Sequence, residues 1–294
     1  MIKESDSVSL RRPELFLPGK AGSRESAVRR PEETLPPLSR YARRGILFNV
    51  SDHISPVIDY RHNGPPNSAQ GGYACGLFAG LVTPSQGSAA AVTLLSPPPL
   101  GVPLEFHRGS RRSQVRRDGQ LIATVAEAAG EPAVIDPLSP AEAEHASHAF
   151  QGFTGHPFPT CFVCGHERPA GDGLALTPGP VEGRPGTVAC LWTPTDEQAS
   201  ADGGIPDELV WSVLDCPGGW TCDPRTEPMV LNRMTAVISR RPVPGDPCVV
   251  VGVLRRRQGR TAVVDTALFD ASGREAGRAS AVWVTVPEGL PASA

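Results

Sequence analysis

The chain carries Gln70-Gly71-Gly72 at the start of one predicted apolar helix and Val213-Leu214-Asp215 at the end of another. The first helix is expected at about Gly71–Val82 and has no carboxylate along it. The second is expected at about Pro206–Asp215, where Cys216-Pro217-Gly218-Gly219 is predicted to stop it directly after the acid. If the two halves pack face to face, the amide-rich start of one helix meets the carboxylate of the other.

Strand patterns follow each predicted helix in the same order. In the first half they are Ala89–Leu95, Val102–His107, Ser113–Arg117 and Gln120–Ala128, after a short strand near Ile46–Val50. In the second half, strands near Leu174–Thr177 and Thr187–Trp192 precede the helix, and those at Met229–Ser239, Cys248–Arg255, Thr261–Phe269 and Glu275–Val286 follow it. Proline-rich kinks containing Gly101 and Gly245 recur at the same place, which is typical of a duplicated unit.

The repeat predicts an α+β fold with two antiparallel sheets, each wrapped around a central helix and meeting edge to edge. We place the first unit at 45–128 and the second at 159–288. The linker at 129–158 is expected to be helical around Pro140–Phe150. Residues 1–44, rich in Arg, Glu, Pro and Ser, are interpreted as a disordered tail, and residues 289–294 as a C-terminal tail.

Composition limits the classes of function. The 294 residues are 39% hydrophobic and carry a formal net charge of −3, so we predict no nucleic-acid partner. The first residues form no apolar signal segment, and no stretch is long and apolar enough to cross a bilayer. We therefore expect a cytoplasmic protein without membrane insertion.

The seven cysteines are an odd number scattered among apolar residues, so they are predicted to be reduced thiols. Cys161 and Cys164 lie near His156 and His166, which raises the question of a zinc site. The usual second Cys or His pair is missing, so we predict no metal or other cofactor, and a tight turn that opens the second half. Cys216 is interpreted as a packing thiol.

These motifs resemble the hotdog superfamily, particularly the acyl-CoA thioesterases of the phenylacetyl-CoA type and their double-hotdog duplicates. Gln70-Gly71-Gly72 resembles the family's His-Gly-Gly with glutamine in place of histidine, and Asn63 resembles the asparagine before it. Val213-Leu214-Asp215 resembles the family's Leu-Leu-Asp, and Cys161–Gly165 followed by Gly171–Leu174 resembles the opening of many members. The resemblance covers about Gly45 to Val286.

The resemblance also shows what each half lacks. Ala79 stands where the family's acid would fall in the first helix, and Pro206-Asp207-Glu208 departs from His-Gly-Gly at the start of the second. Carboxylates there would repel an oxyanion and already complement the helix dipole. We therefore expect a single working site rather than two.

The residues themselves predict an oxyanion pocket and an acid. The Gly71 and Gly72 amides at a helix start can stabilise developing negative charge, and the Asn63 and Gln70 amides can donate further hydrogen bonds. An ordinary turn with a helix start is the alternative interpretation. Asp215 is the candidate general base or nucleophile; capping local amides is its alternative role.

Three further residues are candidates for binding substrate. Thr235 could position a water molecule, or be an ordinary strand threonine. Arg255 and Arg256 could contact coenzyme A phosphates, since phosphate recognition favours arginine, or lie solvated at a hairpin tip.

Three functions remain open from the sequence. The first is a thioesterase acting on acyl-CoA or an acyl-carrier protein, the substrate class that the resemblance implies. The second is a hotdog dehydratase or hydratase with His62 as base opposite Asp215. The third is a non-catalytic acyl-CoA-binding protein, which Gln70 and Ala79 would favour. Double-hotdog proteins often associate further, so a homo-oligomer is a possible assembly.

Overall fold

The computed structural model describes residues 55–82 and 89–286. The expected strand at Ile46–Val50 and the expected tails at 1–44 and 289–294 lie outside the described residues. The helices are α1 (Gly71–Gly80), α2 (Pro140–His148) and α3 (Asp207–Trp220), with short 3-10 turns η2 (Tyr60–His62), η3 (Gln151–Phe153) and η4 (Asp196–Gln198). The strands are β1 (Ala90–Leu94), β2 (Glu105–His107), β3 (Ser113–Arg117), β4 (Gln120–Glu127), β5 (Gly179–Pro180), β6 (Thr187–Trp192), β7 (Met229–Ile238), β8 (Cys248–Gln258), β9 (Thr261–Asp270) and β10 (Glu275–Thr285).

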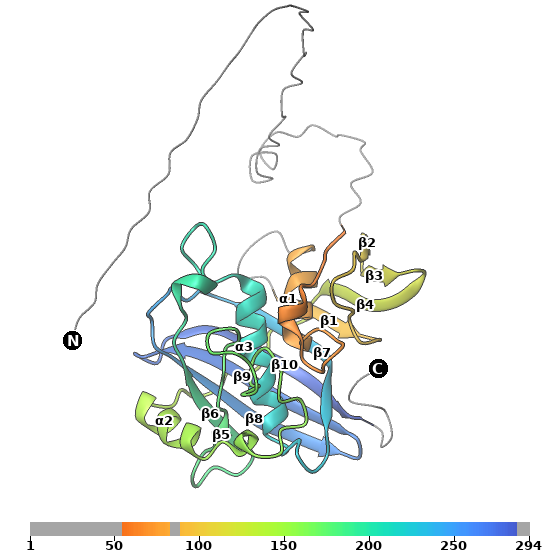
Figure 1. Ribbon diagram of the computed structural model, residues 1–294. Helices are drawn as coiled ribbons and strands as arrows, with labels where there is room; N and C mark the ends of the chain where they lie inside the picture. The colour runs from red at the N-terminus through yellow and green to blue at the C-terminus, as the bar shows by residue number, and fades with distance from the viewer. Residues whose placement is uncertain (1–54, 83–88, 287–294) are drawn as a thin grey trace, which may run out of the picture. The chain divides into compact units, whose positions relative to one another are not determined.

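Within the described residues, one antiparallel sheet of ten strands runs through both halves, in the order β2-β3-β4-β1-β7-β10-β9-β8-β6-β5. The halves join where β1 pairs with β7, for example at Ala91 and Thr235. The predicted sheets therefore merge edge to edge into a single sheet (Figure 1). Helices α1 and α3 pack in one core against this sheet, because residues of both helices and of β1 and β7 belong to the same cluster of buried side chains.

The turns that the sequence predicted occupy backbone conformations that suit their residues. Asp118 and Gly119 both have positive φ, at 48° and 78°, and join β3 to β4 in a tight hairpin. This geometry is the one that Asp-Gly favours between antiparallel strands. Gly101 and Gly245, in the two recurring kinks, also have positive φ.

The second half of the sheet is covered on both faces. Val250 belongs to the core beneath α3, whereas Val249 and Val251 pack with Ala143 and Ala146 of α2 on the other face. This explains why the sequence of β8 reads as a continuous apolar run instead of alternating. The predicted linker therefore contributes a helix that completes the second core.

Two predicted elements were wrong. Leu174–Thr177 is not a strand, because Ala175 has a φ of 49° and the segment's backbone bonds to Phe162 and Val163. The second helix does not stop at Asp215 but continues through Pro217 to Trp220. Its last turn is held by tertiary packing, which overrides the local helix-breaking signal, and the Thr266 hydroxyl donates to the Leu214 carbonyl at 2.6 Å.

Helices α1 and α3 touch at two glycines spaced one turn apart. A Cβ at Gly72 would lie 2.5 Å from the Asp215 Cβ, and one at Gly76 would lie 2.6 Å from the Glu208 Cα and 2.8 Å from the Trp211 Cβ. The helices therefore approach so closely that these positions admit no side chain. The contact also shows that the helices run antiparallel, since Gly72 meets the later part of α3 and Gly76 the earlier part.

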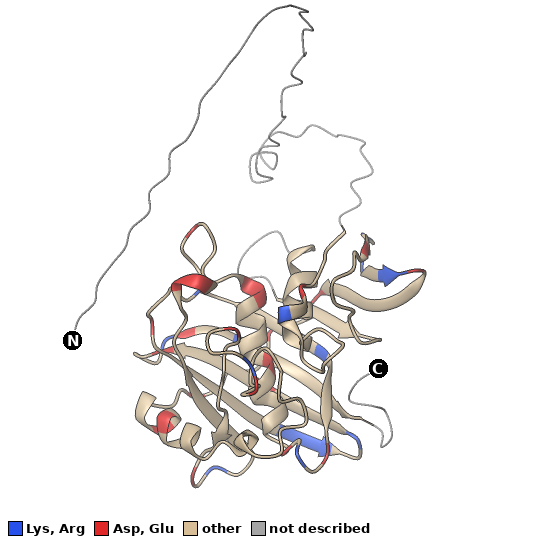
Figure 2. Ribbon diagram, in the orientation of Figure 1, with Lys and Arg blue, Asp and Glu red and all other residues tan. Residues whose placement is uncertain are grey.

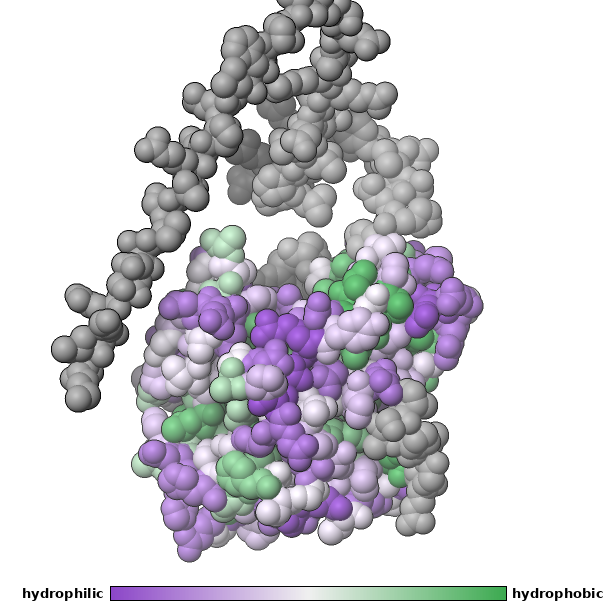
Figure 3. Space-filling model, in the orientation of Figure 1, coloured by the Kyte–Doolittle hydropathy of each residue, from purple (hydrophilic) through white to green (hydrophobic). Residues whose placement is uncertain are grey.

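The surface is mixed in character. On the face shown in Figure 3, hydrophobic residues form separate patches between hydrophilic ones. Among the described residues, no helix is long and apolar enough to cross a membrane.

The close contact predicts an unequal response of two glycines in the same helix. Gly76→Ala should lower the free energy of unfolding by about 1–3 kcal/mol, because the added methyl group overlaps α3. Gly80→Ala is the matched control: its Cβ would meet nothing within 4 Å, so the change should stay within about 1 kcal/mol. Urea unfolding measures both, and equal effects would contradict the packing described here.

Candidate active site

A buried carboxyl group of α3 binds the start of α1. The Gly72 amide donates to Asp215 Oδ2 at 2.8 Å, and Gln70 Nε2 donates to the same oxygen at 2.6 Å. Asp215 and Gln70 are each 2% exposed. The structure thus brings Asp215, Gln70 and Gly72 together, from parts of the chain far apart in sequence.

Gln70 links the two helices because its side-chain amide both donates and accepts a hydrogen bond. It is the N-cap of α1, and its Oε1 accepts from the Tyr73 backbone amide at 2.6 Å. Capping uses the amide oxygen and leaves the NH₂ group free for Asp215. A serine or threonine would cap α1 equally well, but its side chain is too short to reach Asp215 on α3.

Asp215 lies within α3 rather than at its end, and its burial dominates its protonation. Desolvation raises its pKa to about 8, against the opposing hydrogen bonds from Gly72 and Gln70, which favour the carboxylate. Its second oxygen, Oδ1, is buried and has no hydrogen-bond partner among the described residues. The site therefore holds one anchored carboxyl oxygen and one that is unused.

Gly71 lies at the edge of this cluster. It is partly exposed, and within the described ranges its amide has no hydrogen-bond partner. A Cβ at Gly71 would lie 2.8 Å from the Leu231 Cβ and 3.3 Å from Asp215 Oδ2. Leu231, on β7, therefore packs directly against Gly71, and the sequence carried no signal for that contact.

Asn63 is not part of this cluster. Its Oδ1 accepts from the Arg168 guanidinium at 2.6 Å, and its Nδ2 donates to Thr160 Oγ1 at 3.3 Å. Arg168 also bonds Asp172 at 2.7 Å. The Asn63 side chain thus ties the loop before α1 to the opening of the second half, and Arg168, which sequence reasoning missed, is the centre of that link.

His62 is enclosed by rings. It stacks on Tyr73 with centroids 3.9 Å apart and meets Phe162 edge to face. Burial lowers its pKa to about 4, so the ring is neutral. In the part of the chain that the structure describes, no hydrogen bond or ion pair joins it to Asp215.

The candidate substrate-binding residues lie apart from the carboxyl group. Thr235 stands between Met234 and Ala236, which are buried in the core beneath the helices, so strand alternation places it on the opposite face. Arg255 pairs with Asp265 at 2.7 Å, and Arg256 is exposed on the same strand. The structure does not bring these three residues to Asp215.

With the two helices exchanged, the start of α3 and the end of α1 would have to form a second site, but they carry different residues. Asp207 and Glu208 occupy the first turn of α3, where Figure 2 shows acidic residues at one end of the helix. A buried alanine, Ala79, stands near the end of α1. Negative charge at this helix start opposes an oxyanion.

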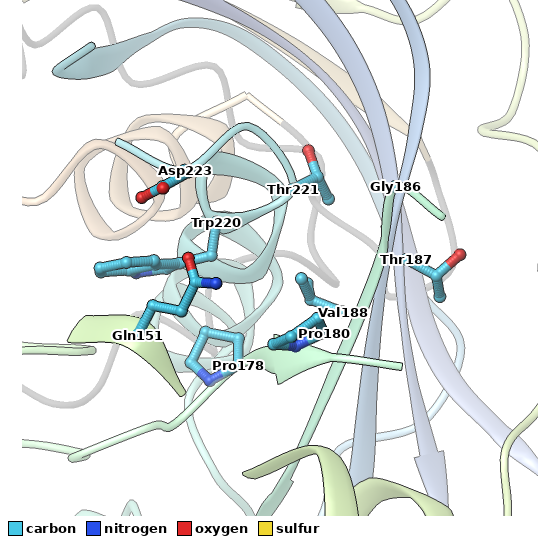
Figure 4. Close-up of a pocket in the computed structure, with 9 residues that line it drawn as sticks. All are labelled: Gln151, Pro178, Pro180, Gly186, Thr187, Val188, Trp220, Thr221 and Asp223. Atoms are coloured by element: carbon cyan, nitrogen blue, oxygen red, sulfur yellow. The ribbon is translucent and has the colours of Figure 1, made fainter. Parts of the chain in front are cut away.

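A surface pocket lies elsewhere, at the C-terminal end of α3. Its volume is about 180 Å³, and Figure 4 shows Trp220 and Gln151 next to each other in it, with the Thr187 side chain pointing away. The other residues that line it are Pro178, Pro180, Gly186, Val188, Thr221 and Asp223. None of the predicted site residues lines this pocket.

Comparison with solved structures identifies the fold. A tesB protein, MAP1729c, of Mycobacterium avium subspecies paratuberculosis superposes with a TM-score of 0.51 and 14% identity, over 76% of this chain and 90% of that one. A hot dog fold protein of Alicyclobacillus acidocaldarius gives 0.53 and 13%, over 81% and 95%. A Novosphingobium aromaticivorans protein whose name assigns it to the thioesterases gives 0.54 and 14%, over 79% and 95%.

These likenesses show that the chain has the double-hotdog fold, as the motif resemblance implied. No protein-family model matches the sequence, and no curated protein sequence matches it. At this level of identity the structures establish the fold alone.

The role of Gln70 as a bridge can be measured. Gln70→Ala should lower the free energy of unfolding by about 1–3 kcal/mol, because it removes the N-cap and one of the donors to a buried carboxyl group. Gln120→Ala removes an exposed glutamine amide and should change stability by no more than about 0.5 kcal/mol. Thermal or urea unfolding of both variants checks this, and a neutral Gln70→Ala would argue against the bridge.

Proposed function

We propose that the protein is a thioesterase that hydrolyses an acyl-CoA or acyl-carrier-protein thioester at one composite site between its halves. The observation that carries the proposal is the contact of the Asp215 carboxyl group on α3 with the Gly72 amide at the start of α1. Thioester hydrolysis needs an acid–base group and an oxyanion donor within reach of one carbonyl. Asp215 and the glycine amides are such a pair.

In the proposed reaction, the substrate carbonyl oxygen accepts from the Gly71 and Gly72 amides, where the dipole of α1 favours negative charge. The ionised form of Asp215 takes a proton from the water that attacks the carbonyl carbon, and because its pKa is raised to about 8, this form increases as the pH rises toward 8. The tetrahedral intermediate collapses, the carbon–sulfur bond breaks, and the leaving thiolate takes that proton from Asp215. The products are a carboxylic acid and a free thiol.

Two features of the site support this assignment. The Gly71 amide has no partner among the described residues, so it is available to a carbonyl without breaking an existing bond. Asp215 Oδ1 is likewise unpartnered but buried, so in this proposal water reaches it only when the substrate enters, while Gln70 and Gly72 hold Oδ2. The tesB and thioesterase names of proteins with the same fold agree with this chemistry.

A non-catalytic acyl-binding protein is the second candidate, because one observation favours it. Asp215 Oδ2 already occupies the Gly72 amide, so a substrate carbonyl at that amide must displace it. In a structural protein this bond would simply lock the two helices together. The dehydratase hypothesis is weaker, since the His62 ring is stacked on Tyr73.

Turnover by Asp215→Asn separates these functions. The variant keeps the shape of the side chain but removes the base, so thiol release from acyl-CoA should fall by about 10²–10⁴-fold. Asp118→Asn is the matched control, because Asp118 is exposed in a hairpin whose positive φ asparagine also tolerates. Its rate should equal that of the unchanged chain.

The assay uses a panel of acyl-CoAs and acyl-carrier proteins with detection of the released thiol, and circular dichroism confirms folding of each variant. Acyl-CoA binding without thiol release from any substrate would contradict the proposal and support the binding protein. Hydration of an enoyl-CoA without release would support the dehydratase. Full activity of Asp215→Asn would remove Asp215 from the mechanism.

A further inference from the structure

Three cysteine thiols gather beside Asp215, and the proposed reaction uses none of them. The Sγ atoms of Cys161, Cys164 and Cys216 lie within 4.8 Å of one another. All three residues are buried and carry free thiols. Cys161 and Cys164 belong to the turn that opens the second half, whereas Cys216 directly follows Asp215 on α3.

We propose that Cys161, Cys164 and Cys216 bind a Zn²⁺ ion as thiolates. Zinc–sulfur bonds of about 2.3 Å in a tetrahedron separate neighbouring sulfur atoms by about 3.8 Å. The Sγ atoms of Cys161 and Cys216 are 3.8 Å apart. This pair is therefore spaced as two ligands of one ion and well beyond the length of a disulfide bond, and the Cys164 sulfur lies within 4.8 Å of both.

The backbone of the turn brings its two cysteines together. The Gly165 amide donates to the Cys161 carbonyl at 2.9 Å, which folds the Cys-x-x-Cys segment back on itself. The sulfur atoms of Cys161 and Cys164 therefore lie close together, with the Cys216 sulfur beside both.

His156 supports the cluster from outside. Its Nδ1 accepts from the Phe158 amide at 2.9 Å, so the proton of the neutral ring is on Nε2. Nε2 lies 3.2 Å from the Cys164 sulfur, to which it donates. The ring thus orients a ligand in the way that outer-shell groups do.

Binding replaces sulfur–hydrogen bonds by sulfur–zinc bonds and releases the thiol protons to solvent. The ion would fasten the turn to α3 one residue from Asp215. Gln70 Nε2, which binds Asp215, also lies 3.6 Å from the Cys216 sulfur, so the metal cluster and the carboxyl site share a boundary.

Cys161 and Cys164 are a single local pair of thiols, and for this reason their spacing predicted no metal. Cys216 is distant in sequence from that pair, and spacing motifs detect only local ligands. The fold supplies the third thiolate by packing α3 against the turn.

Metal analysis of the purified, reduced full-length chain tests the site. After removal of metal with a chelator, the chain should bind equimolar Zn²⁺ and show a higher unfolding temperature. With Co²⁺ as the probe, it should develop the thiolate-to-cobalt charge-transfer absorbance and intense visible bands of a tetrahedral site.

Cys161→Ser, Cys164→Ser and Cys216→Ser should each lose most of the bound zinc and of the charge-transfer band, while Cys222→Ser, a cysteine outside the cluster, should keep both. Titration of the unchanged chain needs no variant to fold. A folded, reduced chain that gives no cobalt–thiolate absorbance with excess Co²⁺ would overturn the proposal. Unchanged metal binding in Cys216→Ser would also overturn the three-thiolate site.

Discussion

The hydrogen bond from the Gly72 amide to Asp215 Oδ2 is the contact around which this molecule is arranged. It joins the start of a helix in one half to a buried carboxyl group of the other. A buried acid is costly unless polar partners meet it, and here the partners are a helix-start amide and a glutamine side chain. The halves must therefore keep their relative placement for the carboxyl group to be tolerated.

Several features away from this bond hold the two halves in the same relative position. The missing side chains at Gly72 and Gly76 let α1 and α3 approach closely enough for the bond to form. The pairing of β1 with β7 fixes the two helices on one continuous sheet. The link between Asn63 and Arg168 attaches the loop that leads into α1 to the second half. Together these contacts make the candidate site a property of both halves, which differ in that α1 has no carboxylate whereas α3 carries Asp215.

Much of this could be predicted from the sequence because the signals were local. The alternation of apolar and polar residues, with the turn residues beside them, predicted β3 and β6 at their observed bounds. The motifs at the start of one predicted helix and the end of the other identified Gln70 and Asp215. The predictions that failed depend on contacts between residues that are far apart in the sequence. The continuation of α3 past Pro217 depends on packing that no local rule contains, and the side-chain directions of Asn63 and Thr235 depend on neighbours from other elements. Cys216 joins Cys161 only in three dimensions, so its role had no sequence signal.

The most direct test of the account is a crystal structure of the protein with a non-hydrolysable acyl-CoA analogue. The account predicts that the carbonyl oxygen of the analogue accepts from the Gly71 or Gly72 amide and that the Asp215 carboxyl group faces the carbonyl carbon. An analogue bound elsewhere, with the bond between Gly72 and Asp215 unchanged, would show that this contact only holds the helices together.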